Sequence, residues 1–320
     1  MSEAQGIISG KAAGRGGGTI SWRGTPIRDR WDSPDMPIAR KRLRLTLRCL
    51  LLLILILALW LGWQVRRARR QREAVAIIES FGGRVVYDWE WGGGMPAAGR
   101  RPPGPGWLRR AIGDEYFQDV AFISFRKAKP DAVRALPTLR AFPSLKALDL
   151  DDSQVTDASL AIVGDLAGLE TLFLSDTAVT DAGIARLTGL GNLRTLNVSR
   201  ADLGDEGLRL LKALPLLEDL SAQGNRFTDR GLSHLGEMTN LKRLLLGGST
   251  TDITDAGMTH LGKLTRLEVL WLRHTNVSDE GLRELEGLTR LRELLVTGSR
   301  VTSGGIGRIQ GKLPNLKGVH

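Results

Sequence analysis

Residues 169–187 read LETLFLSDTAVTDAGIARL, and this stretch joins the two patterns that decide the fold. Its first part has leucines at 169, 172 and 174, the L-x-x-L-x-L frame of a short strand with apolar side chains on one face. Its second part places Ile184 and Leu187 at helical spacing behind Asp181, which predicts a short amphipathic helix. So short a unit cannot bury both stripes by itself, and it therefore needs neighbours of the same kind.

Those neighbours are present on both sides. The frame occurs seven times from Leu145 to Val296, with first leucines spaced by 24, 24, 24, 24, 26 and 24 residues. A degenerate copy at Val120, Ile123 and Phe125 precedes them, and a truncated copy begins at Leu316. The blocks that follow the frames read VTDASL, VTDAGI, LGDEGL, FTDRGL, ITDAGM, VSDEGL and VTSGGI. Such a period predicts stacked strand–helix units over residues 120–320.

These frames resemble the leucine-rich repeat family, in the subtype with an I/V-T-D-x-G-L helix start that also occurs in ubiquitin-ligase adaptors. The resemblance implies an α/β leucine-rich repeat solenoid, with a curved parallel sheet on the concave side and helices on the convex side. No F-box-like segment accompanies the repeats, so a role in ubiquitination is not expected. The family column that often holds Asn or Cys here holds Ser153, Thr177, Ala201, Asn225, Ser249, Thr275 and Ser299.

Three local features of the repeats have structural interpretations. Thr-Asp pairs such as Thr180-Asp181 predict caps at helix N-termini and are not expected to bind metal. The extra residues of the 26-residue unit, around Ser249 to Thr251, predict a bulge between strand and helix. One glycine column predicts close backbone approach or an unusual φ: Gly183, Gly207, Gly231, Gly257, Gly281 and Gly305.

A second kind of pattern lies upstream of the repeats. Residues 49–65 read CLLLLILILALWLGWQV, in which ten residues are Leu or Ile and Trp60 and Trp63 stand at one end. Extended to residue 45, the run is long enough to cross a bilayer, with its tryptophans at the interface. It begins too late for a signal peptide, and no small-x-small cleavage site follows it. We expect a single transmembrane helix over residues 45–65, a layout that resembles short bacterial membrane-tethered repeat proteins.

The remaining segments are assigned by composition. Residues 1–44 are rich in glycine and basic residues and predict a disordered tail. Residues 66–119 predict a juxtamembrane helix, a strand, a Gly/Pro linker and a short helix, which together cap the repeats. The cationic residues beside the span predict contacts with lipid head groups through Arg40, Lys41, Arg42, Arg66 and Arg67.

Charge is distributed unevenly along the chain. Residues 1–72 contain 15 basic and 4 acidic residues, whereas the other 248 contain 30 basic and 31 acidic ones. A nearly neutral repeat region is not expected to bind nucleic acid. Five basic residues flank the span on each side, so the positive-inside rule does not decide its orientation. Because a basic tail without a leader is costly to export, we expect the repeats on the extracytoplasmic side.

A binding site is predicted on the concave face. Strand positions between the second and third core residues include Leu245, Trp271 and Leu295 on adjacent strands, which should form one exposed apolar strip. Arg243, Arg273 and His274 flank it, and an acidic patch lies at the other end of the sheet. Exposed apolar strips with Trp and Arg are typical of protein-binding hot spots.

Catalytic chemistry is not expected. The single cysteine, Cys49, lies in the apolar span, and His234, His260 and His274 are in different repeats without ligand spacing. The sequence therefore predicts no catalytic residues, no metal and no cofactor. The favoured hypothesis is a membrane-anchored protein that recognises a protein or peptide. The alternatives are a structural cell-envelope component that self-associates and an adaptor that faces the cytoplasm.

Overall fold

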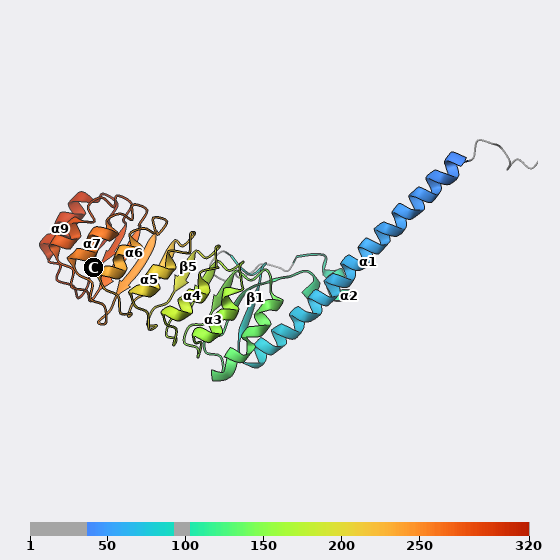
Figure 1. Ribbon diagram of the computed structural model, residues 1–320, viewed down its shortest axis with the longest axis horizontal. Helices are drawn as coiled ribbons and strands as arrows, with labels where there is room; N and C mark the ends of the chain where they lie inside the picture. Colours follow the sequence, from blue (N-terminus) through green and yellow to red (C-terminus); the bar gives the residue numbers. More distant parts are fainter. Residues whose placement is uncertain (1–36, 93–102, 320) are drawn as a thin grey trace, which may run out of the picture. The chain divides into compact units, whose positions relative to one another are not determined.

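The computed structural model describes residues 37–92 and 103–319, and of residues 37–47, 112 and 115 it describes the backbone alone. The chain divides into two units, residues 1–59 and 60–320, each described by itself. Helix α1 (Pro37–Ser80) belongs to both units (Figure 1). The expected disordered tail up to residue 36 and most of the Gly/Pro linker lie outside the described residues.

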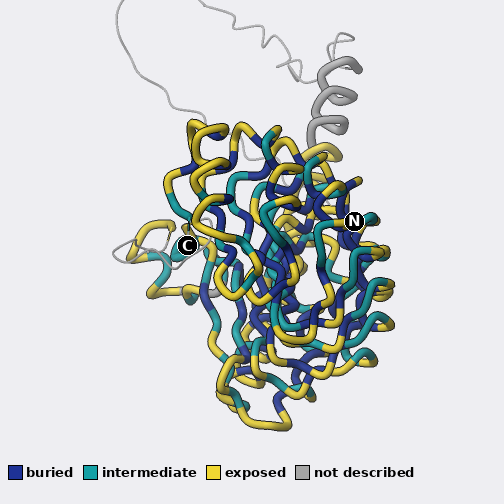
Figure 2. The backbone as a smooth tube through the Cα atoms, turned by 90° about the vertical axis from the view of Figure 1, so that its left-hand side faces the viewer, coloured by how far each residue is buried: buried dark blue, intermediate teal, exposed yellow. Residues whose placement is uncertain are grey.

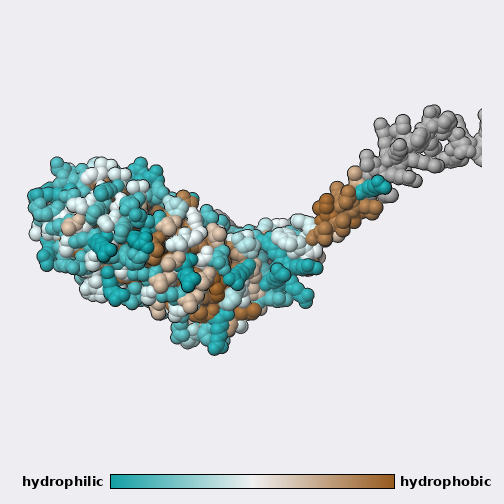
Figure 3. Space-filling model, in the orientation of Figure 1, coloured by the Kyte–Doolittle hydropathy of each residue, from teal (hydrophilic) through white to brown (hydrophobic). Residues whose placement is uncertain are grey.

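In the first unit, α1 begins at Pro37, so residues 37–44 have helical backbone where a tail was expected. Proline suits this first position because its fixed φ matches a helix and its missing N–H needs no partner there. The helix is long and apolar enough to cross a membrane, and none of its most apolar part is buried. Leu and Ile side chains from Leu50 to Leu59 are 48–66% exposed, and Figure 3 shows them as unbroken hydrophobic surface.

In the second unit, the last turns of α1 pack on the repeats. Gln71 donates from Nε2 to the Gln118 carbonyl at 3.1 Å. The helix ends at Ser80, and Gly82 adopts a left-handed φ of 82° at the turn that follows. The juxtamembrane helix predicted at the start of residues 66–119 is therefore the last part of α1. Four residues spaced three or four apart are buried along this part of the helix: Ala68, Gln71, Ala74 and Ile78.

The segment after α1 caps the first repeat. Strand β1 (Arg84–Tyr87) pairs antiparallel with β2 (Val120–Ser124), and so covers an edge of the sheet that would otherwise be open. The short elements α2 (Gly106–Ile112) and η1 (Asp114–Tyr116) follow in the chain.

Within the described residues, ten strands form one sheet in the order of the sequence. From β2 onward all neighbours are parallel, and each repeat is joined to the next through a helical segment, the first being η2 (Pro130–Ala141). The strands are β3 (Ala147–Asp149), β4 (Thr171–Phe173), β5 (Thr195–Asn197), β6 (Asp219–Ser221), β7 (Arg243–Gly247), β8 (Val269–Arg273), β9 (Glu293–Leu295) and β10 (Gly318–Val319). The helices are α3 (Asp157–Gly164), α4 (Asp181–Leu187), α5 (Asp205–Leu211), α6 (Asp229–Leu235), α7 (Asp255–Leu261), α8 (Asp279–Arg283) and α9 (Ser303–Lys312).

The core lies between the sheet and the row of helices. The predicted frame leucines are buried in every repeat; Leu172, Leu196 and Leu220, for example, are fully inaccessible and paired in register. The helix stripe predicted at Ile184 and Leu187 packs on the same core. The buried residues of successive repeats belong to one core, as expected when each unit buries its stripes against its neighbours. Figure 2 shows buried segments gathered in the interior and exposed segments around them.

The Thr-Asp pairs do more than cap their own helices. Thr180 Oγ1 accepts from the Ala182 N–H, which confirms the predicted cap. The aspartate instead binds the next repeat: Asp205 Oδ1 accepts from the Thr228 N–H at 2.9 Å and Oδ2 from the Thr228 hydroxyl at 2.7 Å. The other aspartates of this ladder are Asp157, Asp181, Asp229, Asp255 and Asp279.

The glycine column recurs in successive repeats because each glycine lies against an aspartate of this ladder. A Cβ atom on Gly231 would lie 2.4 Å from Asp205 Oδ1, and the other predicted glycines of the column face the preceding aspartate in the same way. Close approach of the aspartate side chain, and neither the backbone approach nor the unusual φ that was predicted, is therefore what requires glycine at these positions.

The column that holds Ser, Thr, Ala or Asn lies in the turn after each strand, and its polar side chains donate hydrogen bonds to carbonyls of that turn. Thr177 and Thr275 donate their hydroxyls to the carbonyl three residues earlier, while Asn225 Nδ2 donates to two carbonyls. In the 26-residue unit the assignment of Ser249 to this column was wrong. Ser249 is exposed, and Thr251 is buried and donates to the Gly248 carbonyl, because the two extra residues shift the column.

Candidate functional site: the concave face of the sheet

We call the side of the sheet turned away from α3–α9 the concave face. Two rows of side chains lie on it, on either side of the buried frame leucines. The second row contains Phe173, Asn197, Ser221, Leu245, Trp271 and Leu295, which are Cα partners from strand to strand. The structure therefore brings the three predicted apolar residues into adjacent register positions.

Their exposure differs from the prediction. Leu245 is only 8% exposed, while Trp271 and Leu295 are half-buried. Leu245 and Trp271, the largest residue of the row, are partners on adjacent strands. The accessible apolar surface is therefore smaller than expected and centred on Trp271.

Trp271 has a fixed orientation. Its Nε1 donates to Glu293 Oε1 at 2.7 Å, from β8 to β9. A tryptophan held by its polar atom leaves its ring face available at little further cost in side-chain entropy. Sequence reasoning missed Glu293, although it stands two residues before Leu295 on the neighbouring strand and could have been found from the repeat register.

Asp219 is a second residue that the sequence did not single out. Asp219 and Arg243 belong to the first row, which lies on the other side of the frame leucines from Trp271, and they are partners on adjacent strands. Their side chains form an ion pair of 3.4 Å. Burial raises the pKa of Asp219 above its ordinary value, and Arg243 acts in the opposite direction. Arg243 is exposed, as predicted, but its Nε atom pairs with the Asp219 carboxylate.

Arg273 and His274 end the same region. Arg273 is exposed at the end of β8, and no carboxylate pairs with it among the described residues. His274 is exposed at a left-handed corner with φ 53°. Its ring lies over Gly298 of the next repeat, where a Cβ atom would come within 2.4 Å of His274 Nδ1. Arg243 and Arg273 give this end of the concave face a cationic rim, and His274 lies beside it.

The opposite end of the concave face is acidic but internally bonded. Asp149 is buried and accepts from the Ser124 hydroxyl at 2.7 Å, and Asp151 accepts from the Ser175 N–H at 2.7 Å. Burial raises the pKa of Asp151, whereas the Arg200 guanidinium holds the pKa of Asp176 below its ordinary value. Among the described residues, no group of three or more His, Cys, Asp or Glu side chains could hold a metal ion.

The residues predicted to contact lipid head groups differ in exposure and in ion pairing. The side chains of Arg40, Lys41 and Arg42 lie outside the described residues. Arg66 is exposed on α1. Arg67 instead pairs with Asp119 at 2.5 Å and lies 5.6 Å above the Trp63 ring.

Comparison with known proteins supports the repeat architecture. A profile described as "Leucine Rich repeat" matches residues 192–212, which is one strand–helix unit. Internalin C2 from Listeria monocytogenes is 25% identical, with a TM-score of 0.51 over 63% of this chain and 80% of its own. Another internalin of that organism is 23% identical, with a TM-score of 0.48, and covers 57% of this chain. No curated protein sequence gave a significant match.

The repeat period, the parallel register, the profile match and the similarity to internalin C2 show that the chain has a leucine-rich repeat fold. The V-T-D-x-G-L subtype stays a prediction. This chain spans 49% of the length of one internalin and 80% of the other.

Proposed function

We propose that the protein is a membrane-anchored recognition protein whose concave face binds a protein or peptide. The observation that carries the proposal is the half-buried Trp271, held by Glu293 between the other two members of its apolar row. An oriented aromatic side chain beside a cationic rim is typical of a binding hot spot. The absence of enzymatic activity stays a prediction.

The chemistry of the surface indicates the kind of partner. Arg273 has no carboxylate partner among the described residues and stands two positions after Trp271 on the same strand. A ligand with an apolar side chain flanked by carboxylates would contact both the ring of Trp271 and the guanidinium of Arg273. The opposite, acidic end of the sheet would repel such a ligand, which fixes its direction.

Membrane anchoring is the second part of the proposal, and it rests on the uncovered apolar stretch of α1. In lipid, a helix of this kind satisfies its own backbone hydrogen bonds and needs no protein cover. We propose a single crossing with the repeats on the extracytoplasmic side. Reporter fusions to the two ends of the chain decide the orientation, and a cytoplasmic C-terminus would favour the adaptor alternative.

The binding proposal is tested by panning a random peptide library against the full chain in detergent. We expect enriched peptides that combine an aromatic or aliphatic residue with Asp or Glu. Trp271→Ala and Arg273→Glu should each weaken their binding at least about tenfold, since each removes a central contact. Arg230→Glu is the matched control, because Arg230 is also an exposed arginine but lies on α6.

Equal binding by all three variants would contradict the concave-face site. The melting temperature of each variant is measured in parallel, since Trp271 is half-buried and its truncation costs about 1–3 kcal/mol of stability. Self-association of the full chain that Trp271→Ala abolishes, without any enriched peptide, would favour the structural alternative instead.

A further inference from the structure

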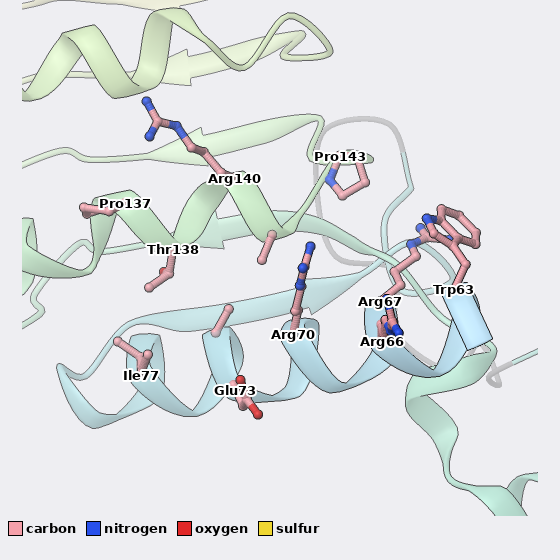
Figure 4. A pocket seen from close by; sticks show the side chains of 12 residues that line it. Trp63, Arg66, Arg67, Arg70, Glu73, Ile77, Pro137, Thr138, Arg140 and Pro143 are labelled. Atoms are coloured by element: carbon pink, nitrogen blue, oxygen red, sulfur yellow. The ribbon is translucent and has the colours of Figure 1, made fainter. Parts of the chain in front are cut away.

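A groove lies between the last turns of α1 and η2, entirely within the unit of residues 60–320 (Figure 4). It has a volume of 890 Å³. One wall is α1 from Trp63 to Ile77, and the other is formed by residues 137–143. Its size suits a small organic ligand or a lipid head group with the start of its chains.

Two arginines of the groove, Arg70 and Arg66, have no ion-pair partner among the described residues. Arg70 points from α1 toward the wall at Pro143 (Figure 4), and it has no ion-pair partner among the described residues. Glu73, the one acidic residue of the lining, pairs with Arg69 at 3.5 Å and points away from Arg70. The groove therefore keeps an unneutralised positive charge over partly apolar walls.

The other arginines of the lining divide into two kinds. Arg67 is engaged by Asp119, and Arg140 pairs with Asp165 at 2.7 Å. Arg66 is exposed and has no ion-pair partner within the part of the chain that the structure describes. Arg66 and Arg70 are four residues apart, so they lie one turn apart on the same side of α1.

The position of these two arginines along α1 identifies the ligand. The apolar run ends at Val65, and Arg66 and Arg70 follow it by about 1.5 and about 7.5 Å along the helix axis. The polar layer of a bilayer is about 5–7 Å thick on each side. The backbone of Arg66 therefore lies within the polar layer and that of Arg70 at its outer edge. Because helix side chains lean toward the N-terminus, which is the membrane end of α1, both guanidiniums can reach the lipid phosphates, while Trp63 stands at the interface where tryptophan is favoured.

We propose that the membrane end of this groove binds the phosphate of an anionic phospholipid. Arg70 and Arg66 donate to the phosphate oxygens, whose geometry the guanidinium fork matches, and the glycerol end of the lipid packs on Trp63. This differs from general attraction between basic residues and head groups, because two named arginines in a walled site make the contact. The proposal rests on the membrane anchoring proposed above.

The test uses the full chain, purified in a neutral detergent, with bound lipid counted by native mass spectrometry. The probes are phosphatidylglycerol, phosphatidylcholine and inorganic phosphate. We expect phosphatidylglycerol to bind about tenfold more tightly than phosphatidylcholine, and Arg70→Gln to remove that preference. Arg69→Gln is the matched control, since it removes the same charge from the adjacent position and Arg69 does not line the groove.

A second variant tests the walls without changing charge. Pro143 is exposed and lines the groove, so Pro143→Trp should narrow the site and weaken phosphatidylglycerol binding several-fold while the fold persists. If the melting temperature shows that this variant does not fold, Arg70→Gln against Arg69→Gln decides the matter.

Three results would overturn the proposal. Equal losses in Arg69→Gln and Arg70→Gln would show diffuse charge attraction, and equal binding of both lipids would show that no anionic head group is recognised. Displacement of the lipid by an equal concentration of inorganic phosphate would make free phosphate the ligand. A chain that stays in solution without detergent would refute the membrane anchoring itself, which is a distinguishable outcome.

Discussion

The helix side of the repeat stack and its concave face obey different rules. On the helix side, the aspartate that begins one helix binds the start of the next repeat, and the pattern recurs from Asp157 to Asp279. On the concave face, the second row changes from Phe173 to Asn197 to Ser221 within three strands. Contacts that hold the units in register must recur, whereas outward positions are free to differ. Recognition is therefore expected where the repeat pattern is broken.

The largest effect is expected on the helix side, at the glycine column. In Gly231→Ala the new Cβ would stand 2.4 Å from Asp205 Oδ1 and 2.9 Å from Leu208 Cδ1. Since Asp205 is tied to Thr228 and cannot easily move, we expect a loss of about 3 kcal/mol in the free energy of unfolding. Urea denaturation measures it, with Gly191→Ala as the control because no atom lies within 4 Å of that Cβ. Equal stabilities for the two variants would show that the ladder is not tightly packed.

A smaller effect separates two members of the same ladder. Asp205 accepts both a backbone N–H and a hydroxyl from Thr228, whereas Asp181 accepts only the N–H of Gly204. Asp205→Ala should therefore cost about 2 kcal/mol and Asp181→Ala about 1 kcal/mol. The difference between their urea midpoints is the measurement. A larger loss in Asp181→Ala would mean that the hydroxyl contributes nothing to the contact between repeats.

The smallest effect is expected on the concave face, and it has the opposite sign to an ordinary ion-pair deletion. Burial raises the pKa of Asp219 above 3.8, so the folded state binds a proton more readily than the unfolded state does. The carboxylate therefore costs stability at neutral pH, and the protein recovers that stability as the pH falls through the folded pKa toward 3.8.

Asp219→Asn should consequently change stability at pH 7 by less than about 0.5 kcal/mol, despite loss of the contact with Arg243. The unfolding free energies of the wild type and the variant, measured between pH 7 and pH 4, should diverge in favour of the wild type on acidification. A clear loss in the variant at pH 7 that disappears on acidification would show that the pair with Arg243 outweighs burial.

Most of the fold could be predicted because its determinants are local and repeated. Frame leucines such as Leu172 and helix starts such as Asp181 follow from spacing alone. The shift from Ser249 to Thr251 could not be predicted, since an insertion of two residues does not say which of the following hydroxyls will reach the turn carbonyl. The helical backbone before residue 45 was also missed, because the expected boundary followed hydropathy and not the proline at which the helix begins, Pro37.

Of the candidate site, the sequence located the row but not its exposure. Leu245, Trp271 and Leu295 are aligned as register arithmetic requires, yet Leu245 is buried and Trp271 is held by Glu293. Spacing says which strands are adjacent, but side-chain volume decides which neighbour covers another. The same holds for Arg67, which sequence assigned to head groups and which the cap engages through Asp119.

The sequence by itself determined the repeat unit, its period and the apolar run, because each depends on residues that are close in the chain or repeated along it. Only the tertiary structure decided that the helix aspartates bind the following repeat, that Asp219 is buried beside Arg243, and that α1 and η2 enclose a groove. These features join residues about 20 to 80 positions apart, and their energies depend on distance, burial and shape, which no local pattern encodes.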